Sequence, residues 1–108
     1  MNRQHWTKLT IAAILLSANA LAEQYAGWIT DANCAKTGEY MGERHKKEVA
    51  AGNPIVFVND ADKKIYVVSN PDKVKEAVGK RVSLQGKIKE LTIEAEEVTV
   101  LEGATGER

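Results

Sequence analysis

Cys34 and His45 lie after the first 22 residues of the chain, and both are residue types that commonly bind metal ions. Cys34 is the only cysteine, and the other histidine, His5, lies near the N-terminus. Thiolate and imidazole groups are ligands that zinc and copper share. The pair therefore suggests a site for Zn or Cu, with Cys34 and His45 as its metal residues. Because a zinc site needs three or four protein ligands, neighbouring carboxylates would have to complete it: Asp31, Glu39, Glu43 or Glu48.

The same two residues also fit a structural interpretation, which the sequence favours. Their spacing of eleven residues matches no familiar metal motif. Cys34 would then be a half-buried residue that closes the first strand, and His45 a solvated helix residue beside Lys46 and Lys47. A third reading is a thiol exposed for pairing between two chains.

An enzyme is not expected. A cysteine nucleophile needs a base within hydrogen-bond reach, and His45 is the only candidate. The chain after residue 22 has no serine in a nucleophile-elbow setting, no glycine-rich phosphate loop and no CxxC pair. We therefore assign no catalytic residue and no obligatory cofactor.

The N-terminus predicts export. Arg3 and Lys8 precede the apolar run LTIAAILL, which ends in the small and polar residues SANALA. This order is typical of a secretory signal peptide with a cut after Ala22. The run is far shorter than the roughly 20 residues that cross a bilayer. We expect a signal peptide over 1–22, a single domain over 23–108, no membrane span after processing, and a periplasmic or secreted location.

Charge and cysteine content limit the classes of function. Removing residues 1–22 takes two of the 15 basic residues and none of the 15 acidic ones, which leaves a net charge of −2. One cysteine cannot close a disulfide within the chain, so packing must stabilise the domain. A nucleic-acid binder should show a basic footprint, but the basic cluster faces glutamates of the next strand, so we expect cross-strand ion pairs and no nucleic acid. The cluster is Lys80, Arg81, Lys87 and Lys89, opposite Glu90, Glu94, Glu96 and Glu97.

Hydrophobic periodicity divides the rest of the chain into strands and short helices. Alternation predicts strands over 24–31, 55–58, 65–68, 81–89 and 91–100, and spacings of three and four predict a helix over 38–51. Asn70, Pro71 and Asp72 predict the capped start of a second helix that stops at Gly79. The apolar residues change parity in the last strand, which predicts a β-bulge near Glu96 and Glu97. Trp28 is expected to fill the core.

This order of elements predicts a mainly β fold. Five strands with a short helix between strands 3 and 4 have the connectivity of the OB-fold, a five-stranded Greek-key barrel. The helix between strands 1 and 2 would be an extra element. Gly27 and Gly86 would sit where the strands coil to close the barrel. An open α+β sheet remains an alternative.

Several segments resemble a group of small exported bacterial proteins that have an OB-like barrel and no established function. The segments are GWITDANC, GNPIVFV, IYVVSNPDKV and GKRVSLQGKI. Members of that group often carry further cysteines around the histidine, whereas this chain has Glu48, Val49, Ala50 and Ala51 there. Only Cys34 and His45 can be carried over from the resemblance.

Together these observations predict an exported binding or interaction module whose partner is an unidentified small ligand or protein. The alternative is a metal- or thiol-dependent protein that uses Cys34 and His45. The two differ in whether the fold brings these side chains together.

Overall fold

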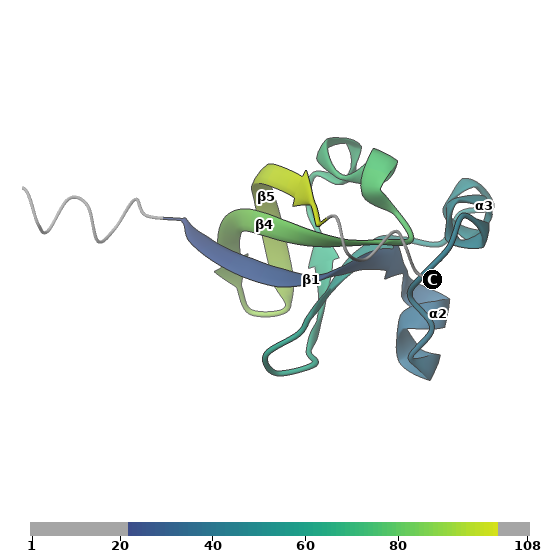
Figure 1. The fold of residues 1–108 in the computed structure, drawn as a ribbon, viewed down its shortest axis with the longest axis horizontal. Coiled ribbons are helices and arrows are strands. Elements are labelled where there is room, and N and C mark those ends of the chain that lie inside the picture. The colour runs from purple at the N-terminus through teal and green to yellow at the C-terminus, as the bar shows by residue number, and fades with distance from the viewer. Residues whose placement is uncertain (1–21, 102–108) are drawn as a thin grey trace, which may run out of the picture.

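A computed structural model describes residues 22–101, and its fold is mainly β (Figure 1). Five strands form one closed sheet in the order β1-β2-β3-β5-β4, and β4 returns to pair with β1. All pairs are antiparallel except β3 with β5. The closed order rules out the open α+β sheet. The strands are β1 (Glu23–Asp31), β2 (Ile55–Asn59), β3 (Ile65–Val68), β4 (Lys80–Lys89) and β5 (Thr92–Val100).

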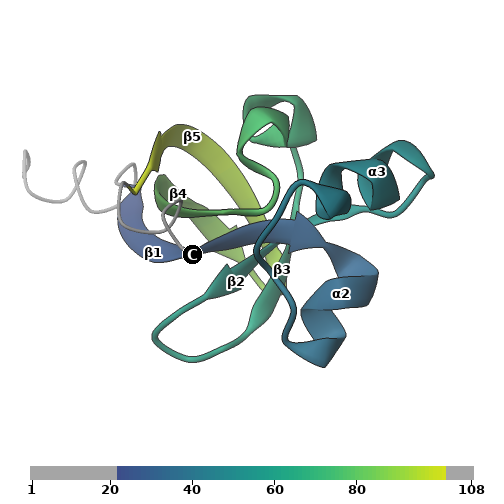
Figure 2. The same cartoon turned by 45° about the vertical axis from the view of Figure 1, so that its right-hand side comes forward.

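Two short α-helices connect β1 to β2, and two single 3₁₀ turns connect β3 to β4. Figure 2 shows both α-helices at the end of the sheet where β1 ends. The helices are α2 (Ala32–Thr37) and α3 (Arg44–Ala50), and the turns are η1 (Pro71–Lys73) and η2 (Lys75–Ala77). The part of the chain that the structure describes has no helix long and apolar enough to cross a membrane.

The main core fills the inside of the closed sheet. The alternation predicted for β4 is confirmed, since Val82 and Leu84 are fully buried. Gly27 allows the close strand approach that the sequence predicted, because a Cβ there would collide with the Val58 carbonyl and lie 2.8 Å from the Phe57 ring. Other members of this core are Ile29, Ile55, Tyr66, Val68, Val74, Ala77, Val78, Ile93 and Ala95.

A second, smaller cluster covers the outer face of β1 and β2 beneath α2. Val56 and Val58 point outward from the sheet and are nevertheless buried, because Ala35 of α2 packs on them. Trp28 is partly buried in this cluster, with its ring centroid 6.0 Å from that of Tyr40. The prediction that Trp28 fills the core is therefore confirmed only in part, because Trp28 packs on the smaller cluster outside the closed sheet.

The helix predicted over 38–51 is confirmed only over α3, and the structure adds α2 before it, which the sequence did not predict. The Asp31 side chain accepts a hydrogen bond from the Cys34 amide at 3.0 Å, so α2 begins immediately after β1. Gly38, with φ of 82°, ends α2 in the left-handed conformation that glycine favours. Cys34 thus lies in the first turn of a helix and does not close the first strand.

The helix predicted from Asn70 to Gly79 is confirmed only in part, because the 3₁₀ turns η1 and η2 take its place. Asn70 caps nothing there; its side chain donates to the Ala95 carbonyl at 2.7 Å and accepts from the Ala95 amide at 2.9 Å. Ala95 pairs with Gly86, and Glu97 pairs with Gln85, so Glu96 is the extra residue between them. The predicted bulge is confirmed, and Asn70 holds the backbone beside it.

The predicted cross-strand ion pairs are met in part. Lys87 lies 3.5 Å from Glu96 on the neighbouring strand. Arg81 instead pairs at 2.6 Å with Asp60, which follows β2. The predicted signal peptide, apart from Ala22, and the tail after residue 101 lie outside the described residues.

Candidate metal-binding site

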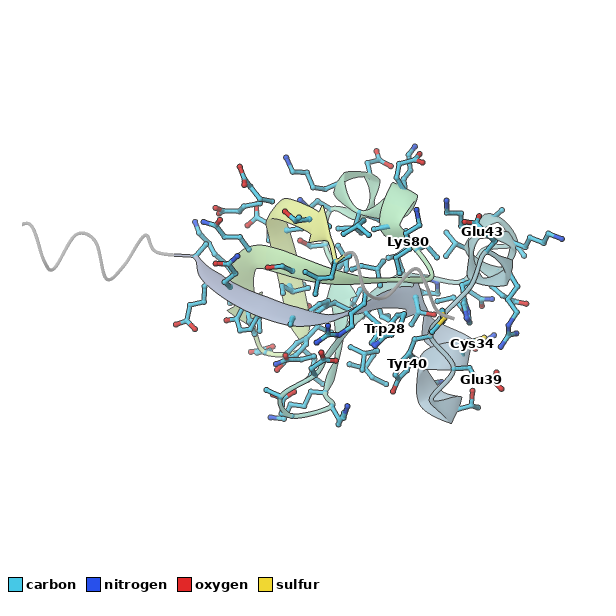
Figure 3. The ribbon with its side chains drawn as sticks, in the orientation of Figure 1. Trp28, Cys34, Glu39, Tyr40, Glu43 and Lys80 are labelled. Atoms are coloured by element: carbon cyan, nitrogen blue, oxygen red, sulfur yellow. The ribbon has the colours of Figure 1, made fainter. Side chains whose placement is uncertain are left out.

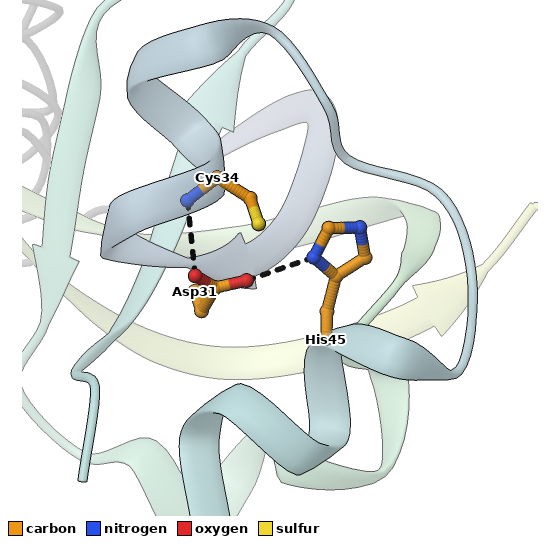
Figure 4. Close-up of side chains that lie close together, drawn as sticks. All are labelled: Asp31, Cys34 and His45. Atoms are coloured by element: carbon orange, nitrogen blue, oxygen red, sulfur yellow. Dashed lines mark hydrogen bonds and ion pairs between the residues drawn. The ribbon is translucent and has the colours of Figure 1, made fainter. Parts of the chain in front are cut away.

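The fold brings Cys34 and His45 together and adds Asp31 to them. Asp31 is the last residue of β1, Cys34 lies in the first turn of α2, and His45 lies in the first turn of α3. One ligand atom from each of the three lies within 4.8 Å of the other two. In Figure 4 the Cys34 thiol, one Asp31 oxygen and the Nδ1 edge of the His45 ring face a common space.

Asp31 organises this cluster through both of its oxygens. Oδ2 accepts the Cys34 backbone N–H at 3.0 Å, and Oδ1 lies 2.8 Å from His45 Nδ1. Burial alone would raise the pKa of Asp31, but the hydrogen bonds from Cys34 and His45 outweigh burial and hold this pKa below its usual value. The carboxylate is therefore ionised at neutral pH, and it can accept a hydrogen bond from His45 Nδ1.

His45 is not the solvated helix residue that the sequence favoured. Its side chain is 0% exposed, because the first turn of α3 packs against the end of β1. Nε2 is buried and has no hydrogen-bond partner among the described residues. An unpaired buried nitrogen costs about 1–3 kcal/mol, so this arrangement is not optimised for stability alone.

Cys34 is the outermost member of the cluster and is only partly buried. Burial raises the pKa of its thiol, the Asp31 carboxylate raises it further, and the positive charge of Arg44 opposes this in part. A protonated thiol is a weak nucleophile. His45 Nδ1 is bonded to Asp31 and not to the thiol, so the geometry does not support a cysteine–histidine catalytic pair.

Of the four carboxylates that the sequence offered as extra ligands, only Asp31 joins the group. Glu39 and Glu43 are exposed on the segment between the helices (Figure 3). Glu48 accepts a hydrogen bond from Asn53 at 2.9 Å. The signal that singles out Asp31 is its place three residues before Cys34, where an aspartate can cap a helix and so be fixed beside the thiol.

No family model matches this chain, and no curated protein or solved structure matches it either. The assignment of the site therefore depends on its residues and geometry.

Proposed function

We propose that this chain is a small exported binding module with an OB-like barrel, and that its ligand is one divalent transition metal ion, zinc in the first instance. The observation that carries the proposal is the meeting of Asp31, Cys34 and His45 from three different elements, with ligand atoms within 4.8 Å of one another.

The topology supports the OB-like part of the proposal. The strand order β1-β2-β3-β5-β4, with β1 paired to both β2 and β4, is the one expected of a five-stranded Greek-key barrel. OB-folds bind ligands with the loop between strands 1 and 2, and here that connection carries α2, α3 and the cluster. The order of charged, apolar and small residues over 1–22 supports export.

The ligand set favours a divalent ion of intermediate softness. One thiolate, one imidazole and one carboxylate are all established zinc ligands, at about 2.0–2.3 Å from the ion. Atoms so placed around a tetrahedral ion are about 3.3–3.8 Å apart. The cluster therefore needs movements of about 1 Å to close on an ion, which the half-exposed Cys34 side chain can supply by rotation.

The total charge of the three ligands also favours a divalent ion. An ionised Asp31, a Cys34 thiolate and a neutral His45 carry a charge of −2, which a divalent ion neutralises. A Cu(I) ion would leave one negative charge in a site where two ligands are fully buried, and unpaired buried charge is costly. Metal binding also removes the thiol proton, because thiolate is the form that coordinates.

A purely structural role for Asp31, Cys34 and His45 accounts for fewer of the features of the cluster. Capping by Asp31 and its bond to His45 would join α2 and α3 to the sheet without any ion. That role gives the Cys34 thiol nothing to do. A metal site uses all three side chains.

Calorimetric titration of the full chain with Zn²⁺ tests the proposal. We expect one ion per chain, and at least about a hundredfold weaker binding in Cys34→Ala, the substitution that disturbs packing least. His45→Gln should weaken binding similarly, and the double variant should be no worse than the weaker single one, because the ligands act as a unit. Glu43→Gln, which removes an exposed charge between the helices, is the control and should bind normally. Absent stoichiometric binding, or binding that Cys34→Ala leaves unchanged, would reject the proposal.

A second candidate, a module for a small organic ligand or protein partner, is favoured by a hollow of about 400 Å³ beside the first residues of β1 and the end of β2. It is lined by Gln24, Tyr25, Ala26, Asn59, Asp60, Ala61 and Arg81. Protein purified from a bacterial host and analysed by native mass spectrometry would show a co-purifying organic ligand as added mass that chelation does not remove.

A further inference from the structure

Building on the proposed metal site, we infer that the bound ion keeps one coordination position open toward solvent, and that this position takes a small oxyanion with help from Arg44. The ligand class comprises carboxylate and phosphate groups small enough to reach an ion beside the Cys34 thiol.

The first step is the count of protein ligands. A closed structural zinc site has four protein ligands, whereas a site with three keeps a position for water or another ligand. Among the described residues the cluster supplies three. The nearest acidic side chains have other partners: Glu39 pairs with Arg44, Glu43 with Lys46, and Glu48 with Asn53. None of them is held in place to be the fourth ligand.

The second step is the direction of the open position. Asp31 and His45 are 0% exposed, whereas Cys34 is partly exposed. An ion bound to all three would thus be covered by protein on the side of β1 and α3, and accessible beside the thiol. An external ligand can approach only from that side.

The third step is the charge beside that opening. Arg44 immediately precedes His45 on α3, and its guanidinium donates at 2.6 Å to Oε1 of Glu39, in the segment that joins the two helices. The Glu39 amide in turn donates to the Cys34 carbonyl at 3.1 Å, which places the Arg44–Glu39 pair beside Cys34. A guanidinium presents paired donors that match the oxygens of carboxylate and phosphate.

The pairing with Glu39 does not prevent this role. The side chains of Arg44 and Glu39 are 56% and 60% exposed, and ion pairs this exposed contribute little to stability. An anion fixed on the metal can therefore replace Glu39 as the partner of Arg44 at little cost. Glu39 would then act as the group that occupies the guanidinium when no anion is bound.

Cobalt substitution tests the open coordination position and the role of Arg44 separately. The full chain is loaded with Co²⁺, whose visible absorption reports coordination number and ligand type, and is then titrated with formate and with inorganic phosphate. We expect a saturable change of the visible bands with at least one of the two anions, and the stronger response shows which oxyanion class the opening accepts. Arg44→Gln should bind the anion at least about tenfold more weakly while retaining cobalt.

The matched control is Lys47→Gln, which removes one positive charge from an exposed position on the same helix and should change anion affinity less than about twofold. Cobalt bands that neither anion alters would show a closed site and overturn the inference while leaving the metal site intact. Anion binding that is equal in Arg44→Gln and the parent would overturn the role of Arg44. No cobalt bands at all would instead reject the proposed function, and this inference with it.

Discussion

The closed sheet and the inserted segment 32–54 differ in how their residues are held in place. In the sheet, inward residues recur at every second position and form one continuous core. In the insertion, helices of six and seven residues bury one residue each, Ala35 in α2 and His45 in α3. The Ala32 amide bonds to the Pro54 carbonyl at 3.0 Å, and the Gly42 amide to the Gly79 carbonyl at 3.0 Å.

This difference separates stability from chemistry. Isolated helices shorter than about 12 residues are marginal in water, so α2 and α3 depend on the sheet for their order. Asp31, Cys34 and His45 nevertheless all lie at or within the insertion, with Asp31 at its junction with β1. The sheet thus acts as the scaffold, and a locally fixed connection carries the candidate site.

The largest loss of stability should come from Gly27→Ala in the sheet. The new Cβ would collide with the Val58 carbonyl and press on the Phe57 ring, and neither the backbone nor a fully buried ring can easily yield. We expect a loss of at least about 3 kcal/mol in the free energy of unfolding, measured by urea denaturation.

The matched variant in the insertion is Gly38→Ala. No atom lies within 4 Å of its added Cβ, and only the left-handed φ of 82° opposes it, at a cost of about 1–2 kcal/mol. If Gly38→Ala proved as damaging as Gly27→Ala, the insertion would contribute to the fold as strongly as the sheet, and the division between them would fail.

An intermediate effect is expected at the junction of the two regions. Asp31→Ala removes the cap of α2 and the partner of His45 Nδ1, so the metal-free protein should lose about 2–3 kcal/mol. Asp31→Asn keeps an oxygen for the Cys34 amide and should lose less. Both should be measured in chelator by thermal and urea unfolding; equal losses in the two variants would show that the charge, and not the cap, is what matters.

The same division explains what could be predicted from the sequence. Strand positions, the number of strands and the bulge near Glu96 and Glu97 followed from period-2 alternation, because a strand that covers a core must alternate. The insertion has no such periodicity: α2 depends on one cap and one glycine, and its start at Ala32 was missed. The burial of His45 could not be predicted, because it results from how α3 packs on the end of β1 and not from any pattern within α3.

A smaller effect, in the sheet, is a loss of stability at alkaline pH. Tyr66 is 5% exposed, and burial first, then the Asp62 charge and the hydrogen bond that its hydroxyl donates to Asp62, raise the pKa of its phenol. A raised folded pKa gives stability that is complete below the unfolded value of about 10 and is lost as pH rises through the folded pKa. We expect the free energy of unfolding to fall above about pH 10, less steeply in Tyr66→Phe. Identical slopes for parent and variant would show that Tyr66 is not responsible.

The smallest effects should come from surface ion pairs, and they should be alike in the two regions. Lys87 and Glu96 in the sheet lie 3.5 Å apart with side chains 49% and 38% exposed. Arg44 and Glu39 in the insertion lie 2.6 Å apart and are more exposed still. Solvent screening and the entropy of ordering long side chains reduce the stabilisation from such pairs to about 0.2–1 kcal/mol.

Double-mutant cycles on each pair, with alanine at both positions, should give coupling energies in that range. Two weak and similar coupling energies would show that the two regions differ in their buried groups. These groups are the continuous core in the sheet and the Asp31–His45 bond in the insertion. A coupling well above 1 kcal/mol for Arg44 and Glu39 alone would show that the insertion is fastened from its surface, and Arg44 would then be too firmly held to turn toward an anion.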